Sequence, residues 1–396
     1  MADEEQSAGL ESPVIPVLPQ EHALQSTKGR FTKGELFGEL KKQLLLAGPL
    51  VSSNFLLFGM QVISVMYVGH LGELSLAVQQ CHSRFLQTQN NVVPMIATTG
   101  IATLVHLLLC WLLIYKTSLG YRGAAVAISI SYWINALLLV VYIRVSPSCI
   151  HTWTGFSKEA FHGIPNFIRL SIPSAIMISL EIWSFEMMVP LSGFLPNPQL
   201  ETSVLSISLN TSSMIYMIPL AFAGAASTRV SNQLGAGQPR LARLAVGVAL
   251  CIVVTEGIVA AAILILGRKV WGYCYSSEKE VVSYVGQMLI LVAVSHFFDG
   301  LQSVLSGIIR GSGQQKIGAY VNLGAYYLMG IPTALLLAFV FHIGGKGLWM
   351  GIIVALFVQA LSLAIIILFT DWEKEVKKAS DRVYNTPTAS NASSVS

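Results

Sequence analysis

Residues 347–370 read GLWMGIIVALFVQALSLAIIILFT, an apolar run that contains no Lys, Arg, Asp or Glu. About 20 helical residues cross the hydrocarbon core of a bilayer, so a run of this length and composition indicates a membrane-spanning helix. Eight further apolar runs of similar length are present, of which the fourth, sixth and seventh contain acidic residues: 44–68, 92–115, 123–143, 170–194, 203–228, 244–267, 281–309 and 317–341. Backbone groups in lipid must be hydrogen-bonded within their own segment. Nine such runs therefore predict an all-α, polytopic membrane helical bundle.

The composition of the whole chain supports this prediction. Of the 396 residues, 54% are hydrophobic and 11% are charged, whereas soluble domains contain about 25% charged residues. The net charge of +4 is spread over loops and tails and forms no basic face interleaved with aromatics, so no nucleic-acid partner is expected. The five cysteines and the histidines show no metal-ligand spacing, so we expect no metal and no disulfide framework. The sequence also lacks the polar cluster that a membrane-embedded enzyme would need.

Two pairs of short motifs indicate an internal duplication. Pro49, Gly69 and Leu71 recur as Pro173, Gly193 and Leu195, and the Gly-rich turn at 120–123 recurs at 344–347. The separations within the two pairs differ by about 100 residues, which is the length of about three spans with their loops. The first half of the duplication is therefore expected to lack about three helices.

This reasoning predicts the organisation of the chain. We expect a truncated N-terminal lobe of three spans over residues 44–163 and a C-terminal lobe of six spans over residues 164–372. Disordered tails are expected at 1–43 and 373–396. An alternative is that the protein never was a duplication of six spans.

The distribution of Lys and Arg gives the expected topology. When alternate loops are counted back from the C-terminus, the side of the C-terminal tail carries about twice as many Lys and Arg as the other side, which predicts a cytoplasmic tail. Nine spans then place the N-terminus outside, although it carries Lys33, Lys41 and Lys42. The first span, 44–68, is therefore expected to be poorly placed.

Several stretches of the chain resemble the plant-type branch of the multidrug and toxic compound extrusion (MATE) family, also called detoxification proteins. They are GHLGELSLA at 69–77, RFLQTQNNVVP at 84–94, TWTGFSKEA at 152–160, LPNPQLETS at 195–203 and STRVSNQLGAG at 227–237. The resemblance implies a two-lobe antiporter of twelve spans that exchanges organic solutes for protons or sodium. This chain departs from that pattern after Ala77, where residues 78–81 lead straight into a stretch that the family places before its fifth span. About nine spans remain.

Acidic residues inside the apolar runs are the candidate coupling residues. A carboxylate in the bilayer costs several kcal/mol and usually marks an ion path or a proton relay. Glu181 and Glu186 are five positions apart, about 140° around a helix, so they do not share a narrow face. By the resemblance, Glu181 and Asp299 correspond to the proton or cation sites of the C-terminal lobe. Glu186 is a third candidate, and Glu256 has less support; each could instead be a hydrogen-bond partner that never titrates.

Four further residues are candidates for lining a substrate cavity. Trp183 and Phe298 lie beside the acids in sequence and could stack on flat or cationic organic solutes. Asn210 and Tyr216 could offer neutral hydrogen-bonding groups. The alternatives are aromatic packing for the first two and hydrogen bonds between helices for the others.

Together, the acids and the resemblance predict a cation-coupled antiporter that exports organic solutes or xenobiotics by alternating access. A proton is the favoured coupling ion, sodium is the other, and no other cofactor is expected. The expected partners are small organic substrates and the lipid bilayer, and a monomer is expected in the vacuolar or plasma membrane. The alternative is a truncated isoform that does not transport, and instead misfolds or associates with an intact transporter.

Overall fold

The computed structural model describes residues 31–65, 73–120, 122–150, 152, 153, 155, 161 and 164–384, and these contain helices and turns but no strand. The helices are α1 (Lys33–Val65), α2 (Glu73–Thr88), α3 (Val93–Tyr115), α4 (Arg122–Val145), α5 (Ile164–Glu186), α6 (Met188–Ser192), α7 (Pro198–Gly235), α8 (Pro239–Trp271), α9 (Lys279–Ser312), α10 (Gln315–Asn322), α11 (Ile331–Leu335), α12 (Gly345–Leu368) and α13 (Trp372–Tyr384). Two π-helical stretches, 323–330 and 336–340, continue α10 and α11 as one span, Gln315–Val340.

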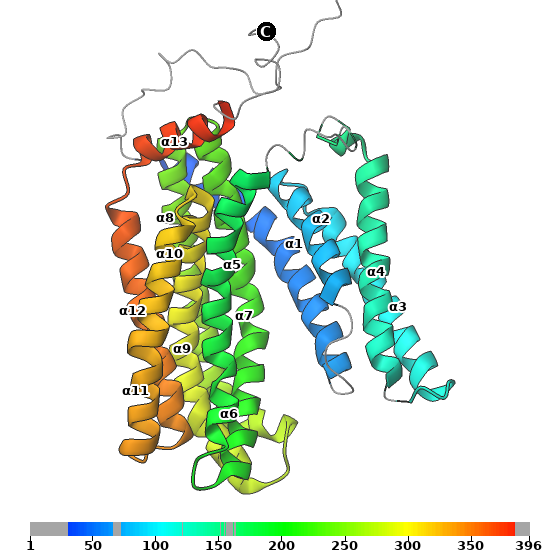
Figure 1. Ribbon diagram of the computed structural model, residues 1–396, viewed down its shortest axis with the longest axis vertical. Helices are drawn as coiled ribbons and strands as arrows, with labels where there is room; N and C mark the ends of the chain where they lie inside the picture. The colour runs from blue at the N-terminus through cyan, green and yellow to red at the C-terminus, as the bar shows by residue number, and fades with distance from the viewer. Residues whose placement is uncertain are drawn as a thin grey trace, which may run out of the picture.

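The predicted helical bundle is confirmed. Among the described residues, nine helical segments are long and apolar enough to cross a membrane, and each overlaps one of the apolar runs found in the sequence. Figure 1 shows the helices in two groups, with α1–α4 in one and α5–α13 in the other. In the larger group α9 packs between α7, α8 and α12, and α1 connects the groups by packing along α7. The two repeat positions Gly69 and Leu71 lie outside the described residues.

Helix α2 carries the chain back toward the end of the molecule where α1 begins. Leu46, in the first half of α1, is buried in one cluster with Leu86 from the end of α2. Met60, near the end of α1, is buried with Tyr132 and packs with Leu76 from the start of α2. α1 and α2 therefore run antiparallel. At 16 residues, or about 24 Å, α2 is shorter than the about 30 Å hydrocarbon core, and its polar residues leave it without an apolar run in the sequence.

The return through α2 brings the two ends of the folded chain to the same side of the bundle. Glu35, in the first turn of α1, pairs with Arg240 at the start of α8 over 2.9 Å. Trp372, at the start of α13, is buried in one cluster with Leu234 from the end of α7. Both contacts lie at the turn between α7 and α8. The prediction that the folded ends lie on opposite sides, with a poorly placed first span, is therefore wrong.

The expected N-terminal disorder is wrong from Lys33 onward, because a capping box starts α1 eleven positions before the first apolar run. Thr32 Oγ1 accepts a hydrogen bond from the backbone N–H of Glu35 at 3.2 Å, and Glu35 Oε2 accepts one from the backbone N–H of Thr32 at 2.8 Å. These reciprocal bonds satisfy backbone donors at the helix start. The helix therefore includes residues 33–43, which were expected to lie in a disordered tail.

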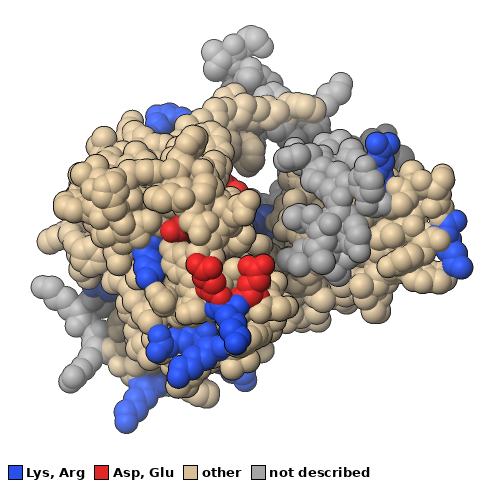
Figure 2. Space-filling model, turned by 90° about the horizontal axis from the view of Figure 1, so that it is seen from below, with Lys and Arg blue, Asp and Glu red and all other residues tan. Residues whose placement is uncertain are grey.

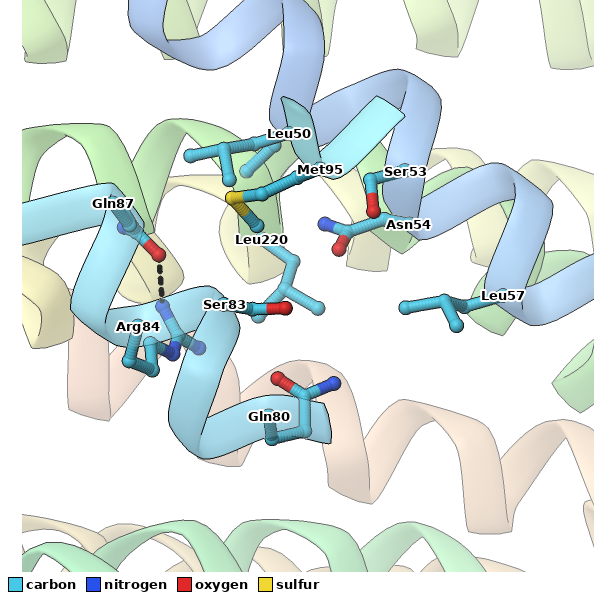
Figure 3. A pocket seen from close by; sticks show the side chains of 12 residues that line it. Leu50, Ser53, Asn54, Leu57, Gln80, Ser83, Arg84, Gln87, Met95 and Leu220 are labelled. Atoms are coloured by element: carbon cyan, nitrogen blue, oxygen red, sulfur yellow. Dashed lines mark hydrogen bonds between the residues drawn. The ribbon is translucent and has the colours of Figure 1, made fainter. Parts of the chain in front are cut away.

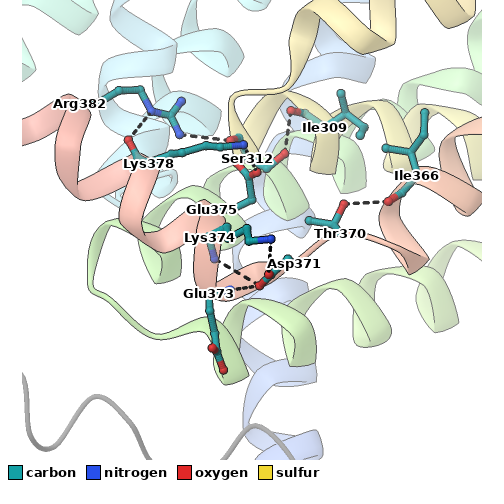
Figure 4. Close-up of polar contacts among 10 residues, drawn as sticks. All are labelled: Ile309, Ser312, Ile366, Thr370, Asp371, Glu373, Lys374, Glu375, Lys378 and Arg382. Atoms are coloured by element: carbon teal, nitrogen blue, oxygen red, sulfur yellow. Dashed lines mark hydrogen bonds and ion pairs between the residues drawn. The ribbon is translucent and has the colours of Figure 1, made fainter.

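The expected C-terminal disorder is wrong for residues 373–384, which lie in α13. Asp371 Oδ1 accepts hydrogen bonds from the backbone N–H groups of Glu373 and Lys374 at 3.2 and 3.3 Å, and this caps the helix (Figure 4). Trp372 is buried against α7 and α8, and Glu375 is buried with a bond to Lys378 at 2.7 Å. A charged amphipathic helix was thus mistaken for a solvated tail.

Candidate functional site

Two of the predicted coupling residues share one hydrogen-bond donor in the larger group of helices. Gln302 Nε2, on α9, donates to Glu181 Oε1 of α5 at 2.8 Å and to Asp299 Oδ1 of α9 at 2.9 Å. Asp299 and Gln302 are buried, with 4% and 0% of their surface exposed. Two carboxylates that are connected through one amide repel each other when both are ionised, so binding of a proton or cation at one changes the affinity of the other.

The amide group of Gln302 is held in the orientation that this arrangement needs. Its oxygen accepts a hydrogen bond from Ser306 Oγ, one helical turn later, at 3.2 Å, so its nitrogen faces the two acids. Because Asp299, Gln302 and Ser306 follow at intervals of three and four residues, they lie on one face of α9. That spacing was visible in the sequence, but Gln302 was not selected because it carries no charge.

Tyr216 of α7 completes the cluster. Its hydroxyl lies 3.5 Å from Glu181 Oε1 and 3.1 Å from Ser303 Oγ. Arg310, farther along α9, is close enough to Glu181 to interact with it electrostatically. Three spans, α5, α7 and α9, thus place polar side chains around the same carboxylate.

A second acid–base pair lies close to this cluster. His296 Nε2 lies 3.1 Å from Glu256 Oε1, and His296 is completely buried. Glu256 Oε2 and His296 Nδ1 are buried without a hydrogen-bond partner in the described part of the chain. Asp299 follows His296 by one helical turn and interacts electrostatically with both members of the pair. The pair is therefore electrostatically linked to the Glu181–Asp299 site.

The remaining predicted site residues are exposed or make other contacts. Glu186 and Asn210 are exposed on the protein surface, and the Asn210 amide donates to Ser206 O of its own helix at 3.1 Å. Trp183 is 60% exposed. Phe298 packs edge-on between Phe297 and Phe357, with ring centroids 5.4 Å apart in both pairs. Of the four cavity candidates, the structure brings Tyr216 to the predicted coupling acids.

The residues of this cluster lie inside a region that matches a known protein family. The MatE family model matches residues 173–336, which include Glu181, Tyr216, Asp299 and Gln302.

Comparison with curated proteins gives similar relatives in Arabidopsis thaliana. Protein DETOXIFICATION 16 is 46% identical over an alignment that covers 89% of this chain and 92% of the relative, and Protein DETOXIFICATION 17 is 45% identical over 87% and 93%. The alignment with the first relative has 448 positions, whereas 89% of 396 residues is about 352, so about 96 positions have no counterpart here. This shortfall agrees with the about 100 residues predicted to be missing.

Solved structures show the same fold. The crystal structure of the eukaryotic MATE transporter AtDTX14 superposes with a TM-score of 0.82 and 38% sequence identity, covering 88% of this chain and 100% of that chain. A multidrug resistance MATE family transporter solved in an outward-facing conformation gives a TM-score of 0.64 at 14% identity, with 88% of each chain covered. The second likeness concerns the fold alone.

Proposed function

This chain belongs to the MATE family of transporters, and from that premise we propose that it is a cation-coupled antiporter that exports organic solutes or xenobiotics, with the proton as coupling ion. It is a multi-pass integral membrane transporter and not an enzyme. The observation that carries the proposal is the cluster in which Gln302 connects Glu181 with Asp299. Its vacuolar or plasma-membrane location is part of the proposal.

The cluster supports coupling because it can bind a proton or a cationic solute, and binding of one weakens binding of the other. When ionised, Glu181 and Asp299 attract a cation or accept hydrogen bonds from a polar solute. Protonation of either acid removes a negative charge from a buried site, where electrostatic attraction is strong, and so favours release of the solute. Gln302 and Tyr216 keep the acids positioned throughout, since both bind Glu181 through neutral groups.

Alternating access needs two groups of helices that can separate at either end. At one end, two ion pairs join the groups: Glu39 of α1 to Arg229 of α7, and Glu35 of α1 to Arg240 of α8. At the opposite end, the space-filling view shows a hollow between the larger and the smaller part of the molecule, next to the atoms drawn in grey (Figure 2). This arrangement supports a conformation in which the two groups of helices are closed against each other at the end where α13 lies.

The about 96 alignment positions that have no counterpart in this chain favour a second candidate function. A transporter that lacks about 96 residues of one lobe could fail to transport, and could instead misfold or associate with an intact transporter. These two functions make opposite predictions for the chain studied alone.

The experiment that tests the proposal is efflux of ethidium, a flat organic cation, from proteoliposomes that contain this chain as their sole protein. An imposed pH gradient should drive saturable ethidium movement, and collapse of the gradient by a protonophore should stop it. A second preparation carries a chain in which the missing spans are restored from a relative. Movement with the restored chain alone would favour the truncated, non-transporting function.

A further inference from the structure

A cavity separate from the acidic cluster lies where the two groups of helices meet. It is lined by α1, α2, α3 and α7, and its volume is about 80 Å³. One water molecule needs about 10–15 Å³ by the same measure, so the cavity has room for a small polar group. Figure 3 shows Gln80 and Ser83 of α2 and Asn54 of α1 directed toward the same space, with Arg84 at its edge beside Gln87.

Arg84 uses little of its hydrogen-bonding capacity in this position. A guanidinium has five N–H donors, and within the described part of the chain Arg84 Nη1 donates to Gln87 Oε1 at 2.8 Å. Gln87 is in turn fixed, because its own amide donates to Thr228 Oγ1 of α7 at 3.2 Å. The remaining donors of Arg84 are therefore available to a ligand in the cavity.

The charge of Arg84 is also uncompensated, unlike that of the neighbouring arginines between the helix groups. Arg229 and Arg240 each contact a carboxylate of α1, at 2.6 and 2.9 Å, whereas no acid in the described ranges lies within ion-pair distance of Arg84. An arginine stays charged in proteins. A positive group thus lines a cavity that solvent can reach but that protein largely surrounds.

We propose that Arg84 binds the carboxylate of a small organic acid in this cavity. The planar guanidinium can bind a carboxylate through two parallel hydrogen bonds. The carboxylate of the ligand would neutralise Arg84, as the carboxylates of α1 neutralise Arg229 and Arg240. Ser83 and Asn54 offer neutral hydrogen-bonding groups beside it, and Leu50, Met95 and Leu220 form an apolar wall for the hydrocarbon part of the acid. The oxyanion chemistry is shared by a lipid phosphate, which the test below separates from a free acid.

The test is equilibrium binding of radiolabelled benzoate to the full chain in nanodiscs of phosphatidylcholine, without any gradient. The parent chain should bind benzoate saturably, and benzamide, which has the same shape without the charge, should not compete. Arg84→Gln should weaken binding at least tenfold. Arg84→Lys should weaken it less, because lysine keeps the positive charge but lacks the two parallel N–H donors of the guanidinium. Arg268→Gln, at the far end of α8, is the matched control and should bind like the parent chain.

The proposal is overturned if Arg84→Gln binds benzoate as the parent does, or if benzamide competes as well as benzoate. The benzamide comparison uses the parent chain, so it decides the question even if Arg84→Gln fails to fold. The same titration is repeated in nanodiscs that contain phosphatidylglycerol. If that lipid abolishes benzoate binding and co-purifies with the parent but not with Arg84→Gln, then a lipid phosphate occupies the site and the assignment to a small acid is wrong.

Discussion

Arg229 of α7 donates two hydrogen bonds to the carboxylate of Glu39 of α1, from Nε to Oε1 at 2.9 Å and from Nη2 to Oε2 at 2.6 Å. Glu39 is 4% exposed and Arg229 is 8% exposed. Gln43, one turn after Glu39, donates to Glu39 Oε1 at 3.3 Å and to Ala245 O of α8 at 2.8 Å. The start of α1 is therefore fastened to the larger group of helices by a buried and well-satisfied polar contact.

Replacing one partner of this ion pair should destabilise the protein strongly. Glu39→Gln leaves Arg229 buried without its carboxylate, and removal of one partner of a buried pair costs about 3–5 kcal/mol. Arg240→Gln is the comparison, because its pair with Glu35 is partly exposed and such pairs contribute about 0.2–1 kcal/mol. Equilibrium unfolding in mixed micelles measures both. Equal losses in the two variants would contradict a special role for the buried pair.

Removing the charge of either coupling acid should stop proton-driven transport. Glu181→Gln and Asp299→Asn keep the shape of each side chain but cannot exchange a proton near neutral pH. In proteoliposomes that contain a transport-competent chain, ethidium efflux driven by a pH gradient should fall to the level of empty liposomes. Glu278→Gln, on the exposed turn before α9, is the charge-matched control and should leave efflux unchanged. Parental efflux from both acid variants would show that other residues couple.

The shared amide should matter as much as the acids, although it carries no charge. Gln302→Leu removes the donor that both carboxylates use and should reduce efflux at least tenfold, because Glu181 and Asp299 lose their common anchor. Ser306→Ala frees the amide oxygen but leaves the nitrogen able to bind, so a smaller loss is expected. Efflux and folding yield are measured together. If the Ser306 variant were as impaired as Gln302→Leu, the orientation of the amide would outweigh its direct bonds.

The cap of α13 should give this helix a pH dependence of its own. The pKa of Asp371 lies below its usual range, chiefly because the backbone N–H of Lys374 donates to its carboxylate. The cap therefore stabilises α13 at pH values above the pKa of Asp371 in the unfolded chain. This stabilisation is lost as the pH falls through the lower, folded pKa. The protection of the amides of residues 373–376 from hydrogen exchange, relative to their intrinsic exchange rates, should fall over that acidic range, and in Asp371→Ala this protection should already be low at neutral pH.

The sequence predicted the parts of the fold that depend on long apolar runs, because lipid requires about 20 apolar residues per helix. It missed α2, where Gln79, Gln87 and Arg84 make the segment too polar to stand out, although packing against α4 and burial of Leu86 hold it as a helix. Glu181 and Asp299 were found by their charge. Gln302 was missed because an uncharged amide can be recognised as part of a site only when its partners on another helix are known.

The path through α2 can be tested by the sides from which the two tails are reached. With α2 as a return pass, Lys33 at the start of α1 and Lys377 in α13 lie at one end, and Lys279 lies at the other. In a background in which the exposed Cys81, Cys251 and Cys274 are replaced by Ser, each lysine is changed singly to Cys and labelled with an impermeant maleimide in sealed vesicles. Lys33→Cys and Lys377→Cys should react from the same side, and Lys279→Cys from the opposite side. A chain that crosses nine times would instead expose the first two on opposite sides, since an odd number of crossings separates its ends.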